Sequence, residues 1–325
     1  MNRRETLIDL SVRAAFMVVI YLVFALQLPN YHTVTGIAAL LDGAVLIGVV
    51  SIGVGISMIA GEFDLSVGSL AALTGVIAMQ IIGIGVFPSL IVAVLFAAVI
   101  GALQGLTIGI LGINSLVFTI GTLIGLRGVA LIISHENSVS MPIEQLSETD
   151  FFTERFLGVL TPLSVGMLVV FVAFGLFLRY SRWGREIYAI GGGRNEARAA
   201  GVPLLRPMVI AFTCSGALAG LGGAVLSIRL GSATPLGFDT LLISAATTCL
   251  LGGIALEGGI GNVIGIAIGL FTLRFLITGV ASMGAPYYVQ NLAAGALLIF
   301  VVVVQLFATR YRRRGARLRL SARAG

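Results

Sequence analysis

The chain has 325 residues, of which 58% are hydrophobic and only 10% are charged, and its mean hydropathy is +1.08. Soluble globular domains are roughly 45–50% apolar and about 25% charged, so the composition excludes an ordinary soluble domain and predicts a protein of the lipid bilayer. The two cysteines lie within apolar runs, which indicates small packing side chains rather than a disulfide scaffold.

The apolar runs are continuous stretches of Leu, Ile, Val, Ala and Gly, without the alternation of a membrane β-strand. They predict an all-α, polytopic integral membrane protein with about ten transmembrane helices. The first run, about 10–28, follows Arg3 and Arg4 but lacks a small-residue cleavage site, so we interpret it as an uncleaved span. The other expected spans are about 38–60, 65–83, 88–112, 115–134, 162–179, 208–228, 240–256, 261–281 and 289–308. Glycines at 252–261 leave open whether the pair around 240–281 is continuous, broken or re-entrant.

All basic residues are arginines, and their distribution predicts the orientation because cytoplasmic loops of membrane proteins are enriched in positive charge. The clusters are Arg3, Arg4 and Arg13, then Arg179, Arg182, Arg185, Arg194, Arg198 and Arg206, and finally Arg310, Arg312, Arg313, Arg314, Arg317, Arg319 and Arg323. Both chain ends and the loop at about 180–207 are therefore expected in the cytoplasm, with the basic tail 310–325 near lipid headgroups. The acidic loop 135–160 is expected outside. The excess of arginine reports topology and argues against a nucleic-acid partner.

Glycines spaced four residues apart predict flat helix faces on which neighbouring backbones pack closely. They are Gly101, Gly105 and Gly109, Gly121 and Gly125, Gly216 and Gly220, and Gly261, Gly265 and Gly269. The chain offers little else for chemistry. It lacks a Cys/His cluster with metal-ligand spacing, and it lacks lysine, which the phosphate loop of an ATPase requires. We therefore expect no catalytic residues, no metal and no cofactor in this chain.

Charged residues within the apolar runs are costly, at least about 2.5–3.5 kcal/mol each at mid-membrane. Asp42, Arg127 and Arg274 are of this kind. Asp42 is expected to pair with Arg127 or Arg274, and a proton relay is the alternative. Asp64 and Ser66 open the third expected span, where a helix cap is the simplest interpretation.

The predicted cytoplasmic loop carries a short segment of small residues, from Glu196 to Gly201. This pattern predicts a short helix that ends at a glycine. A helix of this kind between arginines fits a groove on another protein, and a solvated charged loop is the alternative.

Several stretches of the chain resemble one family. The loop from Tyr188-Ala-Ile-Gly-Gly through Asn195-Glu-Ala to Gly201-Val resembles the coupling segment of ABC-importer permeases of the ribose, xylose and arabinose (monosaccharide) type. Gly61-Glu-Phe-Asp-Leu-Ser-Val-Gly-Ser69 resembles that family's Gly-Gly-Ile-Asp-Leu-Ser-Val-Gly-Ser, and Val117-Phe-Thr-Ile-Gly-Thr122 its Val-Thr-Leu-Gly-Thr. Ser227 to Pro235 and Gly252-Gly253 through Gly261 are also similar, so the matches keep the family's order over about 61–261.

The resemblance implies a division of labour among several chains. This chain would be a single transmembrane permease domain, 1–325, in the cell (inner) membrane, paired with a second permease chain. A cytoplasmic ABC ATPase would bind ATP and Mg, and an extracytoplasmic sugar-binding protein would deliver the sugar. The residues expected to couple to the ATPase are Arg194, Asn195, Glu196, Ala197, Ala200 and Gly201. Those expected at the translocation path or at helix ends are Asp64, Ser66, Ser69, Asn114, Thr119, Thr122, Gly252 and Gly253.

The chain also departs from the family pattern. Glu62 replaces a glycine of the first motif, and the family's Gly-Gly-Thr-Ser is Gly252-Gly-Ile-Ala255, which loses two hydroxyls and puts the identity of the sugar in doubt. Two other classes of function remain open from the residues alone. An ion-coupled secondary transporter would need its own ion site, for which Asp42 is the best mid-span acid, and a membrane anchor or scaffold would have no substrate path.

Overall fold

The computed structural model describes residues 3–156 and 158–304, and the basic tail 310–325 lies outside this part of the chain. The longer helices are α1 (Arg3–Gln27), α2 (Val34–Ile59), α4 (Val86–Leu111), α5 (Ser115–Ser134), α7 (Pro162–Tyr180), α10 (Leu205–Leu230), α12 (Val263–Ser282) and a last helix, Tyr287–Val304. The shorter ones are α3 (Val67–Gln80), η1 (Ile82–Ile84), η2 (Ile143–Thr149), α6 (Asp150–Thr153), α8 (Arg182–Gly192), α9 (Arg194–Ala199) and α11 (Leu241–Leu251). Strands β1 (Val139–Ser140) and β2 (Ser232–Ala233) pair antiparallel.

The helical class is confirmed, but the described part of the chain does not contain ten full-length spans. Within residues 3–156 and 158–304, eight helices are long and apolar enough to cross a membrane. The third and eighth predicted spans form only α3 and α11, of 14 and 11 residues. At 1.5 Å per residue these helices are about 21 and 17 Å long, shorter than the roughly 30 Å hydrocarbon core. Irregular segments at 60–66 and 252–262 interrupt the helical path, while α12 is continuous and of full length.

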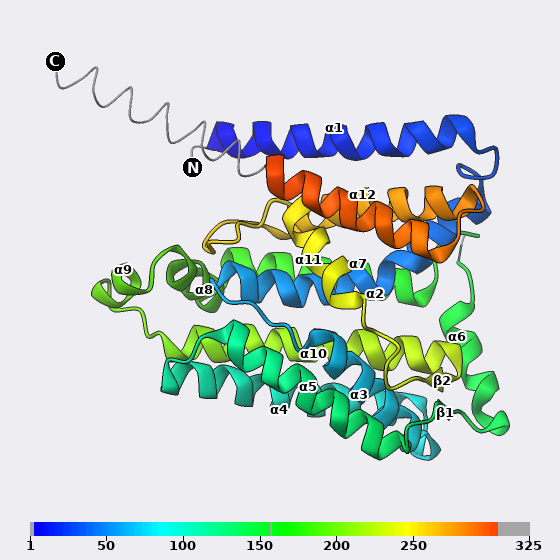
Figure 1. The fold of residues 1–325 in the computed structure, drawn as a ribbon, viewed down its shortest axis with the longest axis horizontal. Helices are drawn as coiled ribbons and strands as arrows, with labels where there is room; N and C mark the ends of the chain where they lie inside the picture. The colour runs from blue at the N-terminus through cyan, green and yellow to red at the C-terminus, as the bar shows by residue number, and fades with distance from the viewer. Residues whose placement is uncertain (1–2, 157, 305–325) are drawn as a thin grey trace.

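The helices are stacked around α2 and α10, as Figure 1 shows. α10 packs on α2, α3 and α4, and α12 packs on α1, α2 and α11. The cluster of buried apolar side chains follows these contacts through α2, α3 and α10. α8 and α9 lie at one end of the molecule, and α6, β1 and β2 lie at the other (Figure 1). The start of α1 and the end of the helix Tyr287–Val304 lie at the same end as α8.

Most of the glycine faces pack as predicted. An added Cβ at Gly101 of α4 would overlap the Phe212 carbonyl oxygen of α10. Likewise, an added Cβ at Gly216 of α10 would overlap the Ala97 carbonyl oxygen of α4. The face of α12 at Gly265 lies in the same way against the backbone of Gly252. The α5 pair is the exception. An added Cβ at Gly121 or Gly125 has no atom within 4 Å among the described residues.

Candidate functional site

The cytoplasmic loop predicted from the arginines folds into two short helices. The Ser181 hydroxyl caps α8 by accepting from the Gly184 N–H at 2.8 Å. At the end of α9, Gly201 adopts a φ of +78°, and the Val202 N–H donates to the Ala197 carbonyl at 2.9 Å. A left-handed residue at this position is the usual end of a helix and strongly favours glycine. The predicted small-residue helix with a terminal glycine is therefore present.

Five of the six predicted coupling residues form an exposed surface around α9. They are Arg194, Asn195, Glu196, Ala200 and Gly201. Ala197 is the exception, because its side chain is only 5% exposed and belongs to the apolar core. Ala197 therefore packs α9 against the body of the protein, and its predicted contact with a partner stays a prediction without an exposed side chain to carry it.

Arg194 also makes an ion pair with Glu62, in the segment between α2 and α3. The Glu62 side chain is 5% exposed, whereas that of Arg194 is 47% exposed. The pair therefore joins the exposed surface of α9 to a buried carboxylate. Glu62, which looked like a departure from the sequence motif, is thus one of the groups that link α9 to the rest of the protein.

Glycines hold α8 against the two irregular segments at the same end. An added Cβ at Gly191 would overlap the carbonyl oxygen of Ile59 and come within 2.6 Å of the Gly259 nitrogen. The Gly259 N–H donates to that same Ile59 carbonyl at 2.8 Å. The Tyr188 hydroxyl donates to the Gly261 carbonyl at 2.8 Å, and burial raises the pKa of Tyr188, so the hydroxyl stays protonated. Three stretches distant in sequence thus meet through backbone contacts.

Two residues after Glu62, the buried carboxylate of Asp64 and the adjoining Ser66 gather polar groups from four helices. The two carboxylate oxygens accept from the Ser66 N–H at 3.0 Å, the Ser66 hydroxyl at 2.6 Å and the Ser215 hydroxyl of α10 at 2.7 Å. The Gln104 amide of α4 donates to Ser66 at 3.0 Å and to the Thr122 hydroxyl of α5 at 3.1 Å. Ser66 starts α3 without a side-chain cap. Asp64 therefore cross-links helices, which is more than the predicted cap.

The backbone of Phe63 links the same segment to α5. Its N–H donates to the Ser115 hydroxyl at 3.3 Å, and its carbonyl accepts from the Thr119 hydroxyl at 3.2 Å. The structure therefore brings Asp64, Ser66, Thr119 and Thr122 together, while their assignment to the translocation path stays a prediction.

The remaining predicted path residues lie elsewhere. Asn114 caps α5 through the Leu116 and Val117 N–H groups, and Ser69 is partly exposed on α3. Gly252 packs on Gly265, and its carbonyl accepts from Arg13 at 3.3 Å. An added Cβ at Gly253 would overlap the Arg13 guanidinium. These two glycines therefore belong to the packing of α1, α11 and α12.

Sequence reasoning missed Gln104, Ser115 and Ser215. Each is a polar residue within a predicted apolar span, and all three are buried. That position was a usable signal, because a buried polar group in a membrane needs a hydrogen-bond partner.

Replacing Asp64 with asparagine is expected to destabilise the protein by about 1–3 kcal/mol, because an amide nitrogen would then face the Ser66 N–H, Ser66 hydroxyl or Ser215 hydroxyl. The measurement is thermal unfolding of the purified protein. Thr107→Ala is the control, because among the described residues that hydroxyl bonds only the Leu103 carbonyl of its own helix, on an exposed face. An unchanged Asp64→Asn protein would contradict the cross-linking role.

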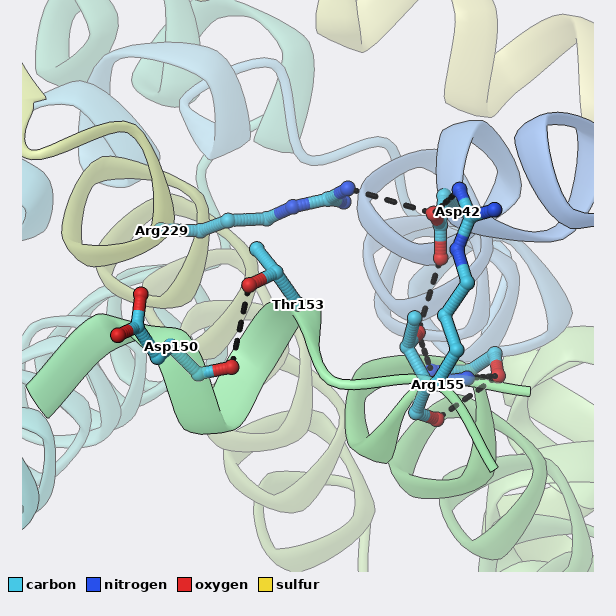
Figure 2. A network of polar contacts seen from close by, with 7 residues as sticks. Asp42, Asp150, Thr153, Arg155 and Arg229 are labelled. Atoms are coloured by element: carbon cyan, nitrogen blue, oxygen red, sulfur yellow. Dashed lines mark hydrogen bonds and ion pairs between the residues drawn. The ribbon is translucent and has the colours of Figure 1, made fainter. Parts of the chain in front are cut away.

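A second polar cluster lies near α6, at the end of the molecule opposite α8 and α9. Figure 2 shows it from close by. The Asp42 carboxylate of α2 accepts from the Thr161 hydroxyl at 2.9 Å and from Arg229 of α10 at 3.4 Å, and it lies 3.8 Å from Arg155. The predicted pairing of Asp42 with Arg127 or Arg274 is wrong. Arg127 pairs instead with Asp239 at 3.4 Å. The helices decide the partners, because α10 brings Arg229 beside α2.

The chain resembles known proteins over most of its length. The family model described as "Branched-chain amino acid transport system / permease component" matches residues 36–302, most of the chain. The chain belongs to this permease family. The permease is 32% identical to the ribose import permease protein RbsC of Escherichia coli (strain K12) over 89% of its own chain and 91% of that protein. It is 29% identical to the L-arabinose ABC transporter permease protein AraH of Azospirillum brasilense over 94% and 90% of the two chains. It is 30% identical to the D-allose transport system permease protein AlsC of E. coli over 89% of each. No solved structure matches.

The family membership fixes the general role of the permease. It is the transport subunit of an ABC importer and a multi-pass protein of the cell (inner) membrane. Members of such systems work with an ATPase and a substrate-binding protein. The role of an enzyme is excluded because the permease subunits in this family are transport components, and the ion-coupled alternative has no support from the relatives.

Proposed function

We propose that the permease conducts a monosaccharide into the cell, powered by a separate cytoplasmic ATPase that binds ATP and Mg. The names of its relatives, which import ribose, L-arabinose and D-allose, support a monosaccharide as the substrate class. A sugar-binding protein would deliver the substrate at the face opposite α9. The exposed α5 face at Gly121 and Gly125 would allow close approach of a second permease chain.

The ion pair between Arg194 and Glu62 is the observation that carries the coupling proposal. The exposed part of α9 is the surface that an ATPase would contact. Arg194 leaves this surface and reaches Glu62, whose chain neighbours Phe63 and Asp64 bond to α5, to Ser66 at the start of α3 and to α10. Ser66 in turn accepts from Gln104 of α4. A displacement of α9 would thus reach four helices through this ion pair and the hydrogen bonds that follow it. Such a rigid connection suits alternating access, which requires packed helices to move as units.

Glycine 201 gives a test of the contact with the ATPase. Gly201→Arg is expected to abolish ATP-driven uptake, because a long charged side chain would project from an exposed, tightly turned helix end. Gly201→Asn is the matched control, since asparagine tolerates the left-handed conformation and is small. The measurement is sugar uptake by liposomes that contain the permease and its ATPase, with the amount of folded permease checked in the same membranes. Normal uptake by Gly201→Arg would remove the coupling assignment.

The same liposomes test the class of transport. Sugar entry is expected only with the ATPase and ATP, and not with an imposed proton or sodium gradient. Entry driven by a gradient without the ATPase would identify a secondary transporter. Failure of entry under either condition, with folded permease present, would favour a scaffold.

A further inference from the structure

A cavity of about 630 Å³ lies between α2, α7, α10 and α12, at the end away from α9. Its lining on α2 extends from Asp42 to Val49, a rise of about 10 Å along the helix. This volume is within the range of about 300–1,000 Å³ that is usual for small-molecule sites. The cavity is thus a partly open space between helices that is large enough for part of a ligand.

The polar lining of this cavity is mainly cationic. Asp42, Arg229 and Arg274 line it, and Arg155 reaches Asp42 at 3.8 Å from the loop after α6. Figure 2 shows Arg155 and Arg229 approaching Asp42 from different sides, while the Asp150 carboxylate points away from them. Arg155 and Arg229 share the Asp42 carboxylate, and Arg274 adds a third guanidinium group to the same cavity, so these three cations exceed the one carboxylate by two positive charges.

These guanidinium groups have hydrogen-bonding capacity to spare. The Arg229 and Arg155 distances to Asp42, 3.4 and 3.8 Å, are longer than the roughly 2.7–2.9 Å of a tight charge-assisted bond. The Nε atom of Arg274 is buried and has no hydrogen-bond partner in the described part of the chain, while its Nη2 donates to Thr278 at 3.3 Å. Buried polar groups are nearly always hydrogen-bonded in proteins. The unbonded Nε of Arg274 therefore indicates that an acceptor is missing from the cavity beside it.

Below the guanidinium groups, the walls are apolar. They are formed by Leu46, Val49, Met167, Val170, Leu221 and Val225. A sugar placed there would lose the hydrogen bonds of its hydroxyls to water and find none in return. A ligand with an anionic head and a hydrocarbon tail would instead match both parts of the cavity. Arg155 and Arg229 lie at the end expected outside, where arginine is disfavoured, and Arg274 lies within α12, where a charge is costly. A local anion would explain the presence of all three.

We propose that this cavity binds an anionic phospholipid of the outer leaflet, with its phosphate beside Arg229 and Arg274 and an acyl chain along α2 and α7. Basic pockets between transmembrane helices are known to hold phospholipid headgroups. The bound lipid would neutralise the excess charge and fill the space between α2 and α10. The proposal does not depend on the transported solute.

The test is a titration of the purified full-length permease in a neutral detergent, with bound ligands counted by native mass spectrometry. The probes are phosphatidylglycerol, phosphatidylcholine with the same acyl chains, and inorganic phosphate. We expect one selective phosphatidylglycerol site per chain. Arg274→Gln and Arg229→Gln are each expected to weaken its binding about tenfold or more. Arg127→Gln is the matched control, because Arg127 lies in a span but pairs with Asp239 on an exposed surface.

A second variant tests the tail without touching the charges. An added Cβ at Gly166 of α7, which lines the cavity, meets no described atom within 4 Å. Gly166→Phe is therefore expected to fold, to fill the cavity and to abolish the site with every arginine in place. Equal binding of phosphatidylcholine, equal weakening by Arg127→Gln, or full affinity in Gly166→Phe would overturn the proposal. Inorganic phosphate that binds as tightly as phosphatidylglycerol would overturn it too and identify a site for a soluble anion.

Discussion

Replacing Gly191 with valine is expected to abolish ATP-driven uptake by forcing α8 away from the helices that it contacts. The new Cβ would overlap the Ile59 carbonyl oxygen and lie 2.6 Å from the Gly259 nitrogen. Both neighbours are backbone atoms, and they are hydrogen-bonded to each other at 2.8 Å. Rotation of a side chain therefore cannot relieve the overlap. We expect a loss of about 3 kcal/mol or more, from overpacking together with the broken backbone bond.

The adjacent Gly192 provides the matched control for this prediction. It lies in the same turn of α8, but an added Cβ meets no described atom within 4 Å. Gly192→Val should therefore leave stability and uptake close to those of the unmodified permease. The measurements are thermal unfolding in detergent and uptake by liposomes that contain the ATPase. Equal behaviour of the two variants would show that α8 is not held at Gly191.

Removing the two members of the Arg194–Glu62 ion pair is expected to have unequal effects. Arg194→Ala leaves a carboxylate that is only 5% exposed without its cation. Loss of one partner of a buried pair costs about 3–5 kcal/mol, and the half-exposed position of Arg194 places the expected loss near the lower end of that range. Glu62→Ala removes the buried charge and leaves Arg194 in contact with water. Its effect on stability should therefore be clearly smaller.

The double variant separates stability from coupling. Glu62→Ala with Arg194→Ala should recover most of the stability lost in Arg194→Ala, because no unpaired carboxylate remains. ATP-driven uptake should remain low in both single variants and in the double variant, because α9 has lost its tie to the segment before α3. Arg198→Ala is a suitable control on the exposed part of α9. Full uptake by the double variant would show that coupling runs through other contacts.

Much of the site could be predicted from the sequence because its signals are local. The glycine at 201 and the small residues before it predicted the end of α9, and the stretch around Asp64 to Ser66 predicted a polar helix start within the membrane. Glu62 was noticed only as a departure from a motif. Its partner could not be found, because Arg194 is far away in the sequence and is one of many arginines in the same loop.

The sequence by itself determined the membrane environment, the helical class, the positions of the apolar runs and the loop that carries α9, since each of these follows from the composition or spacing of neighbouring residues. Only the tertiary structure decided that α3 and α11 are too short to cross alone, that Asp42 pairs with Arg229 and Arg155, and that Ala197 faces inward. The physical reason is that a continuous apolar run shows only that a segment is surrounded by lipid or by other apolar side chains. The partner of a charged side chain depends instead on which backbones approach closely, and here glycine contacts between distant helices set that approach.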